Sequence, residues 1–430
     1  MVYLLYDLIL YVSALFLVPY YLYRGVRYGK TRRGIRERLG AYAQDLLLLL
    51  EGRQVIWVHA VSVGETRAAI PLLKAVRERY PEALLLLSNV TETGRAIATD
   101  VSEIDAYIFF PFDLSWIVRK ALKIIRPSII ILVETEIWPN FVLEARRQNI
   151  PLVLVNGRIS DRSFPRYRMA GRLLEPVLDS ISDYCMQSEQ DSRRIRHLGA
   201  AEGRVRVTGN LKFDMQPPSI DDTNLESLKS ELKLSTNACV WVAGSTHDGE
   251  ETQLVDVYQK LRKVCPDLLL VLVPRHPERC RQVYDELTKA GFIVTLRSTL
   301  ATMNRTLQPG EVMVVDTLGE MLKLYALSNL VFVGGSLVPT GGHNLLEPSA
   351  AGLPVLFGPH IFNFADIADQ LISAQAAIQT PTKEHLQIAL ESLLENPERC
   401  AQMGANGQTV VEENRGSTLR AAQMIISRLS

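Results

Sequence analysis

Hydrophobic residues along the chain gather in short continuous runs, and longer segments with helical spacing separate one run from the next. The runs are rich in Val, Ile, Leu and aromatic residues, and most end in a small, polar or charged residue. Continuous apolar runs that alternate with helices indicate parallel strands in a sheet covered by helices on both faces. The pattern therefore predicts an α/β protein.

The runs fall into two series. The first series predicts strands at 54–61, 83–90, 106–112, 128–136, 151–158, 183–189 and 205–210. The second predicts strands at 238–245, 267–275, 292–296, 311–317, 330–336 and 354–360. The stretch from Met215 between them is polar, with paired prolines and paired aspartates, which is typical of a linker. We therefore expect two Rossmann-like βα domains facing a cleft.

The N-terminal residues 2–23 are almost wholly apolar, and about 20 such residues span a bilayer. Asp7 and Pro19 interrupt the run, so a tilted span and an interfacial helix both fit. The next segment, 24–38, carries seven Lys and Arg against one acid. This basic collar attracts anionic lipid and predicts that the rest of the chain is cytoplasmic. The alternative is a buried core helix with a solvated basic face.

Composition narrows the function classes. Lys and Arg total 47, as do Asp and Glu, and this balance disfavours a general nucleic-acid binder. The five cysteines are odd in number and none stands in C-x-x-C spacing. We expect reduced, structural thiols in a cytosolic setting, and no zinc site.

Charged residues follow three predicted strands of the first series. Glu65 in HAVSVGET stands where a strand passes into a helix, Glu134 and Glu136 lie in VETEIWPN, and Lys212 lies in GNLKFD. An acid there can stabilise a helix N-terminus through the helix dipole. The other interpretation is functional, because α/β folds place their chemistry at the carboxyl ends of strands. Three charged groups at three strand ends favour the second interpretation.

The second series ends its strands with features that suit a nucleotide. Arg275 can grip a phosphate or form a structural ion pair. The amides of Leu318 and Gly319 precede a predicted helix, an arrangement that binds anions. Asn344 and Glu347 lie one turn apart on a further helix, where a carboxylate can accept two ribose hydroxyls. In this order the features resemble the donor domain of nucleotide-sugar glycosyltransferases of the GT-B type.

The resemblance becomes specific when the segments are taken together. HAVSVGET, VETEIWPN, NGRIS, GNLKFD, STHDGEE, LVPRHPER, DTLGE, GGSLVPTGGHN and FGPHIFNF resemble the bacterial 3-deoxy-D-manno-octulosonic acid (Kdo) transferases. These enzymes transfer Kdo from CMP-Kdo to the lipid A precursor, lipid IVA. The resemblance covers essentially the whole chain and implies a lipid A-specific transferase at the cytoplasmic face of a bacterial inner membrane.

The resemblance also implies roles for single residues. Glu65 corresponds to the proton acceptor, and Glu134 and Lys212 to groups that stabilise the transition state. The implied CMP contacts are Pro274, Arg275, Leu318, Gly319, Glu320, Asn344, Leu345, Leu346 and Glu347. Relatives can carry Pro at the position of Leu345, so a contact there is expected through backbone.

This assignment implies direct displacement with inversion, with Glu65 as base. We expect no cofactor and no metal, because no D-x-D-like site stands at a strand end. The expected partners are CMP-Kdo, lipid IVA and, through the N-terminal segment, membrane lipids, but no nucleic acid. Residues 161–172 interleave arginines with Phe164 and Tyr167 and suit acceptor phosphates, the bilayer surface or a solvated helix face.

The expected organisation is a membrane-anchor helix at 1–23 and a basic collar with a connecting helix at 24–53. An acceptor-binding domain at 54–215, a linker at 216–235 and a CMP-sugar-binding domain at 236–430 follow, with the last helix able to pack back on the first domain. Two other functions fit the pattern. One is a GT-B transferase or epimerase that uses a UDP-sugar, and the other is a membrane-tethered nucleotide-binding protein without activity.

Overall fold

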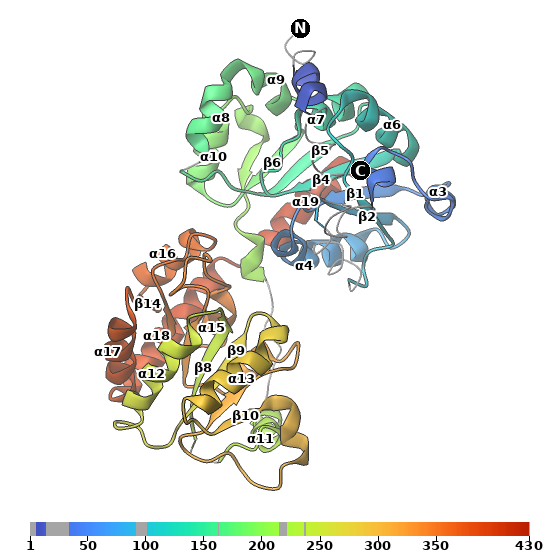
Figure 1. Cartoon of the computed structure of the whole chain (residues 1–430). Coiled ribbons are helices and arrows are strands. Elements are labelled where there is room, and N and C mark those ends of the chain that lie inside the picture. The colour runs from blue at the N-terminus through green and yellow to red at the C-terminus, as the bar shows by residue number, and fades with distance from the viewer. Residues whose placement is uncertain are drawn as a thin grey trace. The chain divides into compact units, whose positions relative to one another are not determined.

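The computed structural model describes residues 6–13, 34–91, 101–161, 163–214, 222–235 and 238–429. The chain forms two compact units, Met1–Met215 with Asn414–Ser430 and Gln216–Glu413 (Figure 1). Each unit holds one seven-stranded parallel sheet with helices packed on it. The expected α/β class with two sheets is confirmed.

The sheet of the first unit has the order β3-β2-β1-β4-β5-β6-β7. Its strands are β1 (Val55–His59), β2 (Leu84–Asn89), β3 (Ala106–Phe109), β4 (Pro127–Val133), β5 (Leu152–Gly157), β6 (Asp183–Met186) and β7 (Val205–Val207). Its helices are α2 (Ile35–Arg38), α3 (Gln44–Leu50), α4 (Val63–Arg79), α6 (Ser115–Ile125), α7 (Pro139–Arg147), α8 (Phe164–Ala170), α9 (Glu175–Leu178), α10 (Glu189–His197) and α19 (Ser417–Leu429). Short 3-10 turns are η1 (Gly171–Leu173), η2 (Glu202–Arg204) and η3 (Leu211–Asp214).

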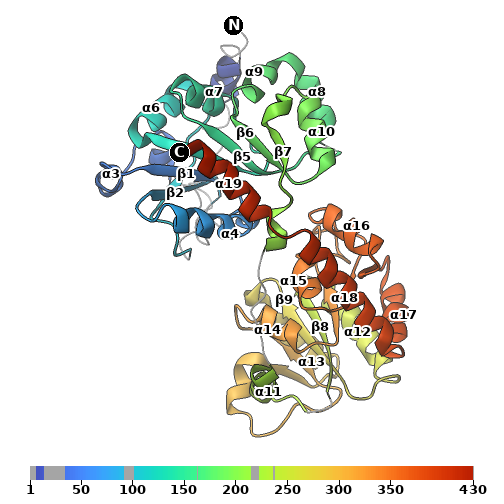
Figure 2. The same cartoon turned by 180° about the vertical axis from the view of Figure 1, so that it is seen from behind.

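Both faces of this sheet are buried, which explains the continuous apolar runs. Successive side chains of a strand point to opposite faces. Trp57 of β1 therefore packs in one core with α6 and α7, while Ile56 and Val58 pack in the other with α4 and α19. Figure 2 shows the C-terminal helix α19 beside α4. The last helix of the chain thus belongs to the first unit.

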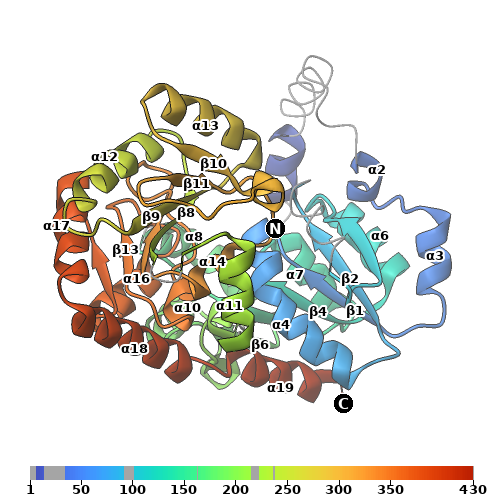
Figure 3. The ribbon, with the colours of Figure 1, turned by 90° about the horizontal axis from the view of Figure 1, so that it is seen from below.

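The sheet of the second unit has the order β10-β11-β9-β8-β12-β13-β14. Its strands are β8 (Cys239–Thr246), β9 (Leu268–Pro274), β10 (Val294–Leu296), β11 (Val312–Val314), β12 (Leu330–Val333), β13 (Val355–Phe357) and β14 (Ala377–Gln379). Its helices are α11 (Asp222–Glu231), α12 (Glu251–Leu261), α13 (Cys280–Lys289), α14 (Met321–Ala326), α15 (Leu346–Ala350), α16 (Ala365–Ser373), α17 (Lys383–Leu394) and α18 (Pro397–Glu413), with 3-10 turns η4 (Pro277–Arg279) and η5 (Arg297–Thr302). Trp241 of β8 packs in a core with α12, α13 and α17, and Figure 3 shows α12 beside α17.

Two local features differ from the sequence pattern. The stretch predicted as a linker contains α11, which ends at Glu231, and this acid forms an ion pair with Arg297. Leu232 and Leu234 after it are buried, so this part of the stretch is packed on the second unit. The strand β14 was not predicted. It has only three residues and ends in an exposed glutamine, so it lacks the apolar run that marks the other strands.

Residues 6–13 form a helix that is bonded to the first unit. The Tyr6 hydroxyl donates to Asp113 Oδ2 at 3.1 Å. The Asp7 carboxylate accepts from the backbone N–H of Ser115 at 3.3 Å and from Asn140 Nδ2 at 2.7 Å. The same helix exposes Leu8, Ile9, Tyr11 and Val12.

The predicted membrane anchor lies only partly within the described residues, because 1–5 and 14–23 fall outside them. None of the helices that the structure describes is both long enough and apolar enough to cross a bilayer. The anchor is therefore not confirmed, and the part of it that is described is a short helix fastened to the first unit by Tyr6 and Asp7.

Candidate active site

Both sheets change the direction of their strand order near the middle. The change falls between β1 and β4 in the first unit and between β8 and β12 in the second. Open α/β sheets bind ligands outside the carboxyl ends of the strands at such a switch point. Glu65 follows β1 and Glu134 follows β4, so the structure places both predicted acids at the switch point of the first sheet.

Glu65 closes the first turn of α4. Ser62 is the N-cap, and its hydroxyl accepts from the backbone N–H of Glu65 at 3.3 Å and donates to Glu65 Oε1 at 2.9 Å. The backbone N–H of Val61 donates to Glu65 Oε2 at 2.7 Å. The arrangement is similar to a capping box, except that the carboxylate accepts from the backbone N–H of the residue before the N-cap. Glu65 therefore does stabilise the N-terminus of α4, and these hydrogen bonds fix its carboxylate in one orientation.

The environment of Glu65 also changes its proton affinity. Its side chain is buried, and burial, followed by the charge of Glu134, raises the pKa of Glu65 to about 7. The hydrogen bonds from Val61 and Ser62 oppose this rise, and the charge of Glu136 adds to it. Burial, followed by Glu134, also raises the pKa of Glu136. The structure thus brings the three acids close enough to repel one another, and Glu65 is poised to exchange a proton near neutral pH.

Glu134 has an unusual backbone. Its φ is 62°, in the left-handed region that side chains rarely adopt. Non-glycine residues held in such regions cost roughly 1–3 kcal/mol and cluster at functional sites. The neighbouring Thr135 fastens the segment, because its hydroxyl bonds the carbonyl oxygen of Arg158 and accepts from the backbone N–H of the same residue at 2.9 Å. The contacts of Thr135 thus anchor the segment that carries this strained residue.

Lys212 stands on η3, which packs against α4 and α19. The adjoining Asn156 and Asp214 explain why this segment is ordered. Asn156 Oδ1 accepts from the backbone N–H of Leu211 at 3.0 Å, and Asp214 accepts from the N–H of Gly416 at 2.7 Å at the start of α19. Lys212 is thus carried by a turn that is tied to the helix beginning with Glu65, although the charge of Lys212 is not among the causes of the shift at Glu65.

In the second unit, Pro274 ends β9 and is buried, and Arg275 follows it. The backbone N–H of Arg275 donates to the carbonyl oxygen of Thr246 at 2.9 Å, which fixes the segment to β8. In the described part of the chain no carboxylate pairs with the Arg275 guanidinium, whereas Arg279 nearby is paired with Glu251 at 2.9 Å. Arg275 is the cation at these strand ends that remains available for an anion.

The other predicted nucleotide contacts lie around α14 and α15. Leu318 is 81% exposed and Gly319 has a φ of 81°. The Glu320 carboxylate bonds Arg297 Nη2 at 2.8 Å and the Thr317 hydroxyl, so it is already engaged. Any contact from this loop to a nucleotide is then best made by backbone.

Asn344 and Glu347 were predicted one turn apart on a helix, but α15 begins only at Leu346, so Asn344 lies in the loop before it. The two side chains nevertheless contact each other. Asn344 Nδ2 donates to Glu347 Oε1 at 3.1 Å, and Asn344 Oδ1 accepts from the backbone N–H of Leu346 at 3.1 Å. Leu345 and Leu346 are buried at 0% and 3% exposure. These two residues therefore offer only backbone to a ligand.

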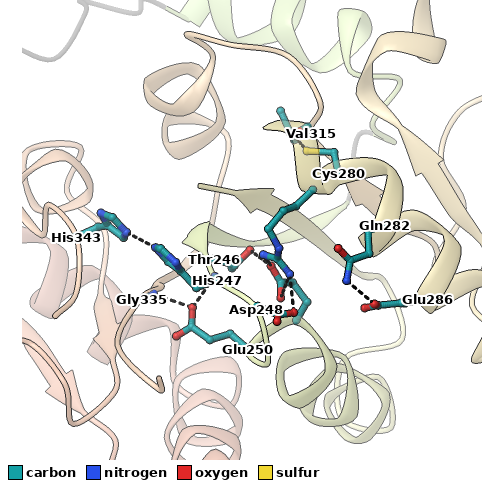
Figure 4. Close-up of polar contacts among 12 residues, drawn as sticks. Thr246, His247, Asp248, Glu250, Cys280, Gln282, Glu286, Val315, Gly335 and His343 are labelled. Atoms are coloured by element: carbon teal, nitrogen blue, oxygen red, sulfur yellow. Dashed lines mark hydrogen bonds and ion pairs between the residues drawn. The ribbon is translucent and has the colours of Figure 1, made fainter. Parts of the chain in front are cut away.

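The structure adds three residues that the motifs did not single out. His247 and His343 meet at the switch point of the second sheet, and the buried Glu250 accepts hydrogen bonds from four backbone amides there (Figure 4). The segments STHDGEE and GGHN contain these residues, but nothing in either segment indicates that they face each other. All five cysteines are free, and no three His, Cys, Asp or Glu side chains among the described residues gather in a way that could hold a metal ion.

The chain is similar to known transferases over most of its length. The sequence profile described as 3-deoxy-D-manno-octulosonic-acid transferase (kdotransferase) matches residues 33–215. A 3-deoxy-D-manno-octulosonic acid transferase of Haemophilus influenzae is 35% identical over 407 residues, 93% of this chain and 92% of that protein. The proteins of the same name from Bordetella pertussis and Chlamydia pneumoniae are 34% and 31% identical, covering 85% and 91% of this chain and 85% and 89% of their own lengths.

Solved structures of more distant sequence share the fold. A UDP-GlcNAc 2-epimerase from Neisseria meningitidis bound to UDP-GlcNAc is 14% identical, covers 87% of this chain and 99% of its own, and superimposes with a TM-score of 0.57. HepE of Anabaena in complex with UDP and glucose is 17% identical over 87% of this chain and 98% of its own, with a TM-score of 0.55. These two likenesses concern the fold alone, which is α/β and GT-B-like. The relatives above 30% identity cover most of the chain, and the chain therefore belongs to the 3-deoxy-D-manno-octulosonic-acid transferase family of glycosyltransferases.

Proposed function

We propose that this protein transfers Kdo from CMP-Kdo to the lipid A precursor, lipid IVA, with Glu65 as the general base. The observation that carries the proposal is the Glu65 carboxylate, which is held at the carboxyl end of β1 with a pKa raised to about 7 by burial and by Glu134. Membership of the transferase family supports Kdo as the transferred sugar. CMP as the carrier follows from the resemblance of the segments that surround Arg275 and Glu347.

The proposed reaction moves one proton to Glu65 and replaces the bond between Kdo and CMP. The acceptor is a sugar hydroxyl, which is a weak nucleophile while it keeps its proton. Glu65 takes that proton as the acceptor oxygen attacks the anomeric carbon of Kdo, and the bond between this carbon and the CMP phosphate breaks. A base within hydrogen-bond reach contributes roughly 10²–10⁴-fold to such a step. Attack on the face opposite the departing CMP inverts the configuration.

Positive groups would stabilise the negative charge that grows on the departing phosphate. Arg275 suits this role, because no carboxylate in the described chain neutralises it. Fixed donors aimed at a developing charge are often the largest single contribution to catalysis. We assign Lys212 and Glu134 to the transition state as well, Lys212 through its charge and Glu134 through the strained strand end that carries it.

The nucleotide would be held mainly by the second unit. The Glu347 carboxylate would accept the ribose hydroxyls, and Asn344 at 3.1 Å orients it. The amides of Leu318, Gly319 and Glu320 would serve as donors, since the Glu320 side chain is engaged by Arg297. Pro274 is buried and would contact the nucleotide through its carbonyl group.

We also propose that the N-terminal segment holds the enzyme at the cytoplasmic face of the bacterial inner membrane. The supporting features are the apolar run 2–23, the four exposed apolar side chains of the helix at 6–13, and the basic collar that follows. An acceptor that stays in the bilayer makes such attachment useful, because it raises the effective concentration of the two partners.

Exposed cations of the first unit would assist acceptor binding. Arg166 and Arg168 on α8 are exposed, and Tyr167 of the same helix donates to the carbonyl oxygen of Thr135 at 3.4 Å, next to Glu134. Arg162 lies outside the described residues. A basic helix next to a candidate catalytic strand end is a suitable place for the phosphates of lipid IVA.

Incubation of the purified protein with lipid IVA and CMP-Kdo, followed by mass spectrometry, tests the proposal. The expected product is lipid IVA heavier by whole Kdo residues, and CMP should inhibit its formation while UDP should not. A matched incubation with a UDP-sugar in place of CMP-Kdo is the control. Transfer or epimerisation of the UDP-sugar, with no Kdo added, would contradict the proposal.

A further inference from the structure

Two histidines without a role in the proposed mechanism meet at the switch point of the second sheet. His247 follows β8, His343 lies between β12 and α15, and their Nε2 atoms are 2.8 Å apart. The rings are stacked with centroids 5.1 Å apart and planes 8° from parallel. Figure 4 shows the His343 ring pointing toward His247.

The short distance restricts the protons on the pair. One Nε2 must carry a hydrogen and donate it to the other, because two lone pairs or two N–H groups facing each other repel. Burial, followed by the charges of His247 and Arg275, lowers the pKa of His343 to about 3. Burial, followed by His276, also lowers the pKa of His247. Without a ligand, both rings are therefore neutral at physiological pH.

Both cations and carboxylates lie around the pair. Arg275 and His276 follow β9 and disfavour a proton on either histidine. Arg279 on η4 also faces His247, but it bonds Asp248 at 3.0 Å and Glu251 at 2.9 Å. Arg275 is the cation beside the pair for which the described residues provide no carboxylate partner. A guanidinium without a carboxylate partner, next to two ring nitrogen atoms that can be protonated, is suited to an anion.

A buried carboxylate holds both loops that carry the two histidines. Glu250 is 0% exposed and accepts from the backbone N–H of His247 at 2.9 Å, Gly335 at 2.7 Å, Ser336 at 3.0 Å and Leu337 at 2.8 Å. A Cβ atom on Gly335 would come within 3.1 Å of His343 Nε2, so the His343 ring rests on the same loop. Glu250 is thus a positioning residue that acts through the backbone of both loops.

We propose that His247 and His343 bind an anionic group of the sugar donor, and that the pair takes up one proton from solvent as the donor binds. The inference rests on the proposed function. In CMP-Kdo the anomeric carbon carries two anions, the phosphate and the carboxylate of the sugar. The hydrogen bond between the two rings is then broken, each Nε2 donates its N–H to an oxygen of one anion instead, and the added proton neutralises that anion. Arg275 remains for the other anion. A neutral sugar bound to UDP lacks this carboxylate, so the pair would favour an acidic sugar.

Calorimetry in two buffers of different ionisation enthalpy measures the proton uptake. The probes are CMP alone, free Kdo alone and the two together, near pH 7.5. The wild-type protein should take up close to one proton on binding. The His343→Gln variant should take up almost none and bind at least tenfold more weakly. His385→Gln, which changes an exposed histidine on α17, is the matched control and should behave as wild type.

The arms of this experiment separate the two anions. The phosphate of CMP titrates near pH 6, so the difference between wild type and His343→Gln is the informative quantity. A difference seen with CMP alone assigns the phosphate to the histidine pair. A difference that needs Kdo assigns the carboxylate.

Binding of CMP and Kdo with equal affinity and equal proton uptake in wild type and variant would overturn the inference and leave the proposed function intact. Failure of the wild-type protein to bind any of the three probes would contradict the proposed function itself. If His343→Gln does not fold, the imidazole ¹⁵N shifts of the wild-type protein decide. They should move to imidazolium values on addition of CMP and Kdo, and unchanged shifts would overturn the inference.

Discussion

β1 and β8 have equivalent positions in the two sheets, since each is the first strand of its unit and lies at the switch point of its sheet. The residues that follow the strands at the two switch points differ in charge. β1 and β4 lead to Glu65 and Glu134, whereas β8 and β9 lead to His247 and Arg275. Repulsion among acids raises the pKa of Glu65, and repulsion among cations adds to the burial that lowers the pKa of His247.

The difference shows how one scaffold can serve two partners. In the first unit the crowding of acids makes a carboxylate ready to accept a proton. In the second unit, nearby positive charges disfavour a proton on the histidine pair, and a bound anion would offset this repulsion. Burial, which disfavours any isolated charge, strengthens both effects. We therefore propose that the first unit carries out proton transfer and the second recognises the donor.

The largest effect is expected for Glu65→Gln, which tests the role of the first unit in proton transfer. The amide keeps the shape and can still accept the N–H of Val61, but it cannot take a proton. The rate of Kdo transfer should fall at least roughly 100-fold, with CMP affinity unchanged. Single-turnover kinetics and calorimetry provide the two values. Glu78→Gln, an exposed change on the same helix, is the control, and a Glu65→Gln variant above a tenth of wild-type rate contradicts the assignment.

The second half of the comparison is tested by Glu250→Gln. The amide oxygen can accept at most part of the four backbone N–H groups, and a buried donor without a partner costs roughly 1–3 kcal/mol. The free energy of unfolding of the variant should be about 2 kcal/mol lower, and the variant should bind CMP several-fold more weakly. Denaturant unfolding and calorimetry measure the two effects. Glu412→Gln, at an exposed acid on α18, should change neither, and equal stability of the two variants argues against a positioning role.

A smaller effect is expected for Glu347→Ala. The variant loses the carboxylate that is proposed to hold the ribose, and hydrogen bonds to a charged group are worth roughly 1.5–3 kcal/mol each. CMP should bind at least tenfold more weakly, which is about 1.4 kcal/mol. Transfer at saturating donor should change little. Glu398→Ala on α18 is the exposed control, and an unchanged CMP affinity in the Glu347 variant places the ribose elsewhere.

The smallest effect concerns Asp7, which ties the N-terminal helix to the first unit. Asp7→Ala removes the acceptor of Asn140 Nδ2 and of the Ser115 backbone, although Asn140 keeps its bond to the carbonyl oxygen of Asp113 at 2.6 Å. We expect a loss of about 1 kcal/mol in the free energy of unfolding. Thermal unfolding in detergent measures it, with Leu8→Ala at an exposed position as control. Equal stability would mean that the helix is not part of the folded unit.

The sequence predicted the strands and the acids at their ends because both are local features. Thirteen apolar runs mark strands, and Glu65 and Glu134 directly follow two of them. β14 escaped notice because its residues, Ala377–Gln379, lack the apolar run that marks the other short strands. The alternation of apolar runs also predicted parallel sheets, since βα units pack in few other ways.

The remaining site residues depend on which strands are neighbours. His247 and His343 are 96 positions apart and meet only because β8 lies beside β12. Asp7 and Asn140 are separated by 133 positions. Hydrophobic periodicity fixes faces but not strand order, so these contacts could not be read from the pattern. The αL backbone of Glu134 was equally hidden, because nothing in the side chain of a glutamate indicates a positive φ.

The titration of Glu65 links activity to stability. Its folded pKa of about 7 lies above the ordinary value near 4.5. The neutral carboxyl group therefore contributes stability that is complete below about pH 4.5 and is lost as the pH rises through about 7. In the proposed role, Glu65 can accept a proton only after it has lost its own. The transfer rate should therefore rise over the same pH range in which this contribution to stability is lost.

The pH dependence of single-turnover Kdo transfer, in wild type and in Glu134→Gln, tests the central claim most directly. The wild-type rate should rise about tenfold per pH unit below neutrality and level off above about pH 7. In Glu134→Gln the maximal rate should be lower and the midpoint should move to lower pH, because the repulsion that raises the pKa of Glu65 is reduced. A rate that does not change between pH 5 and 8, or a midpoint unaffected by Glu134→Gln, would contradict the assignment of proton transfer to the acids of the first unit.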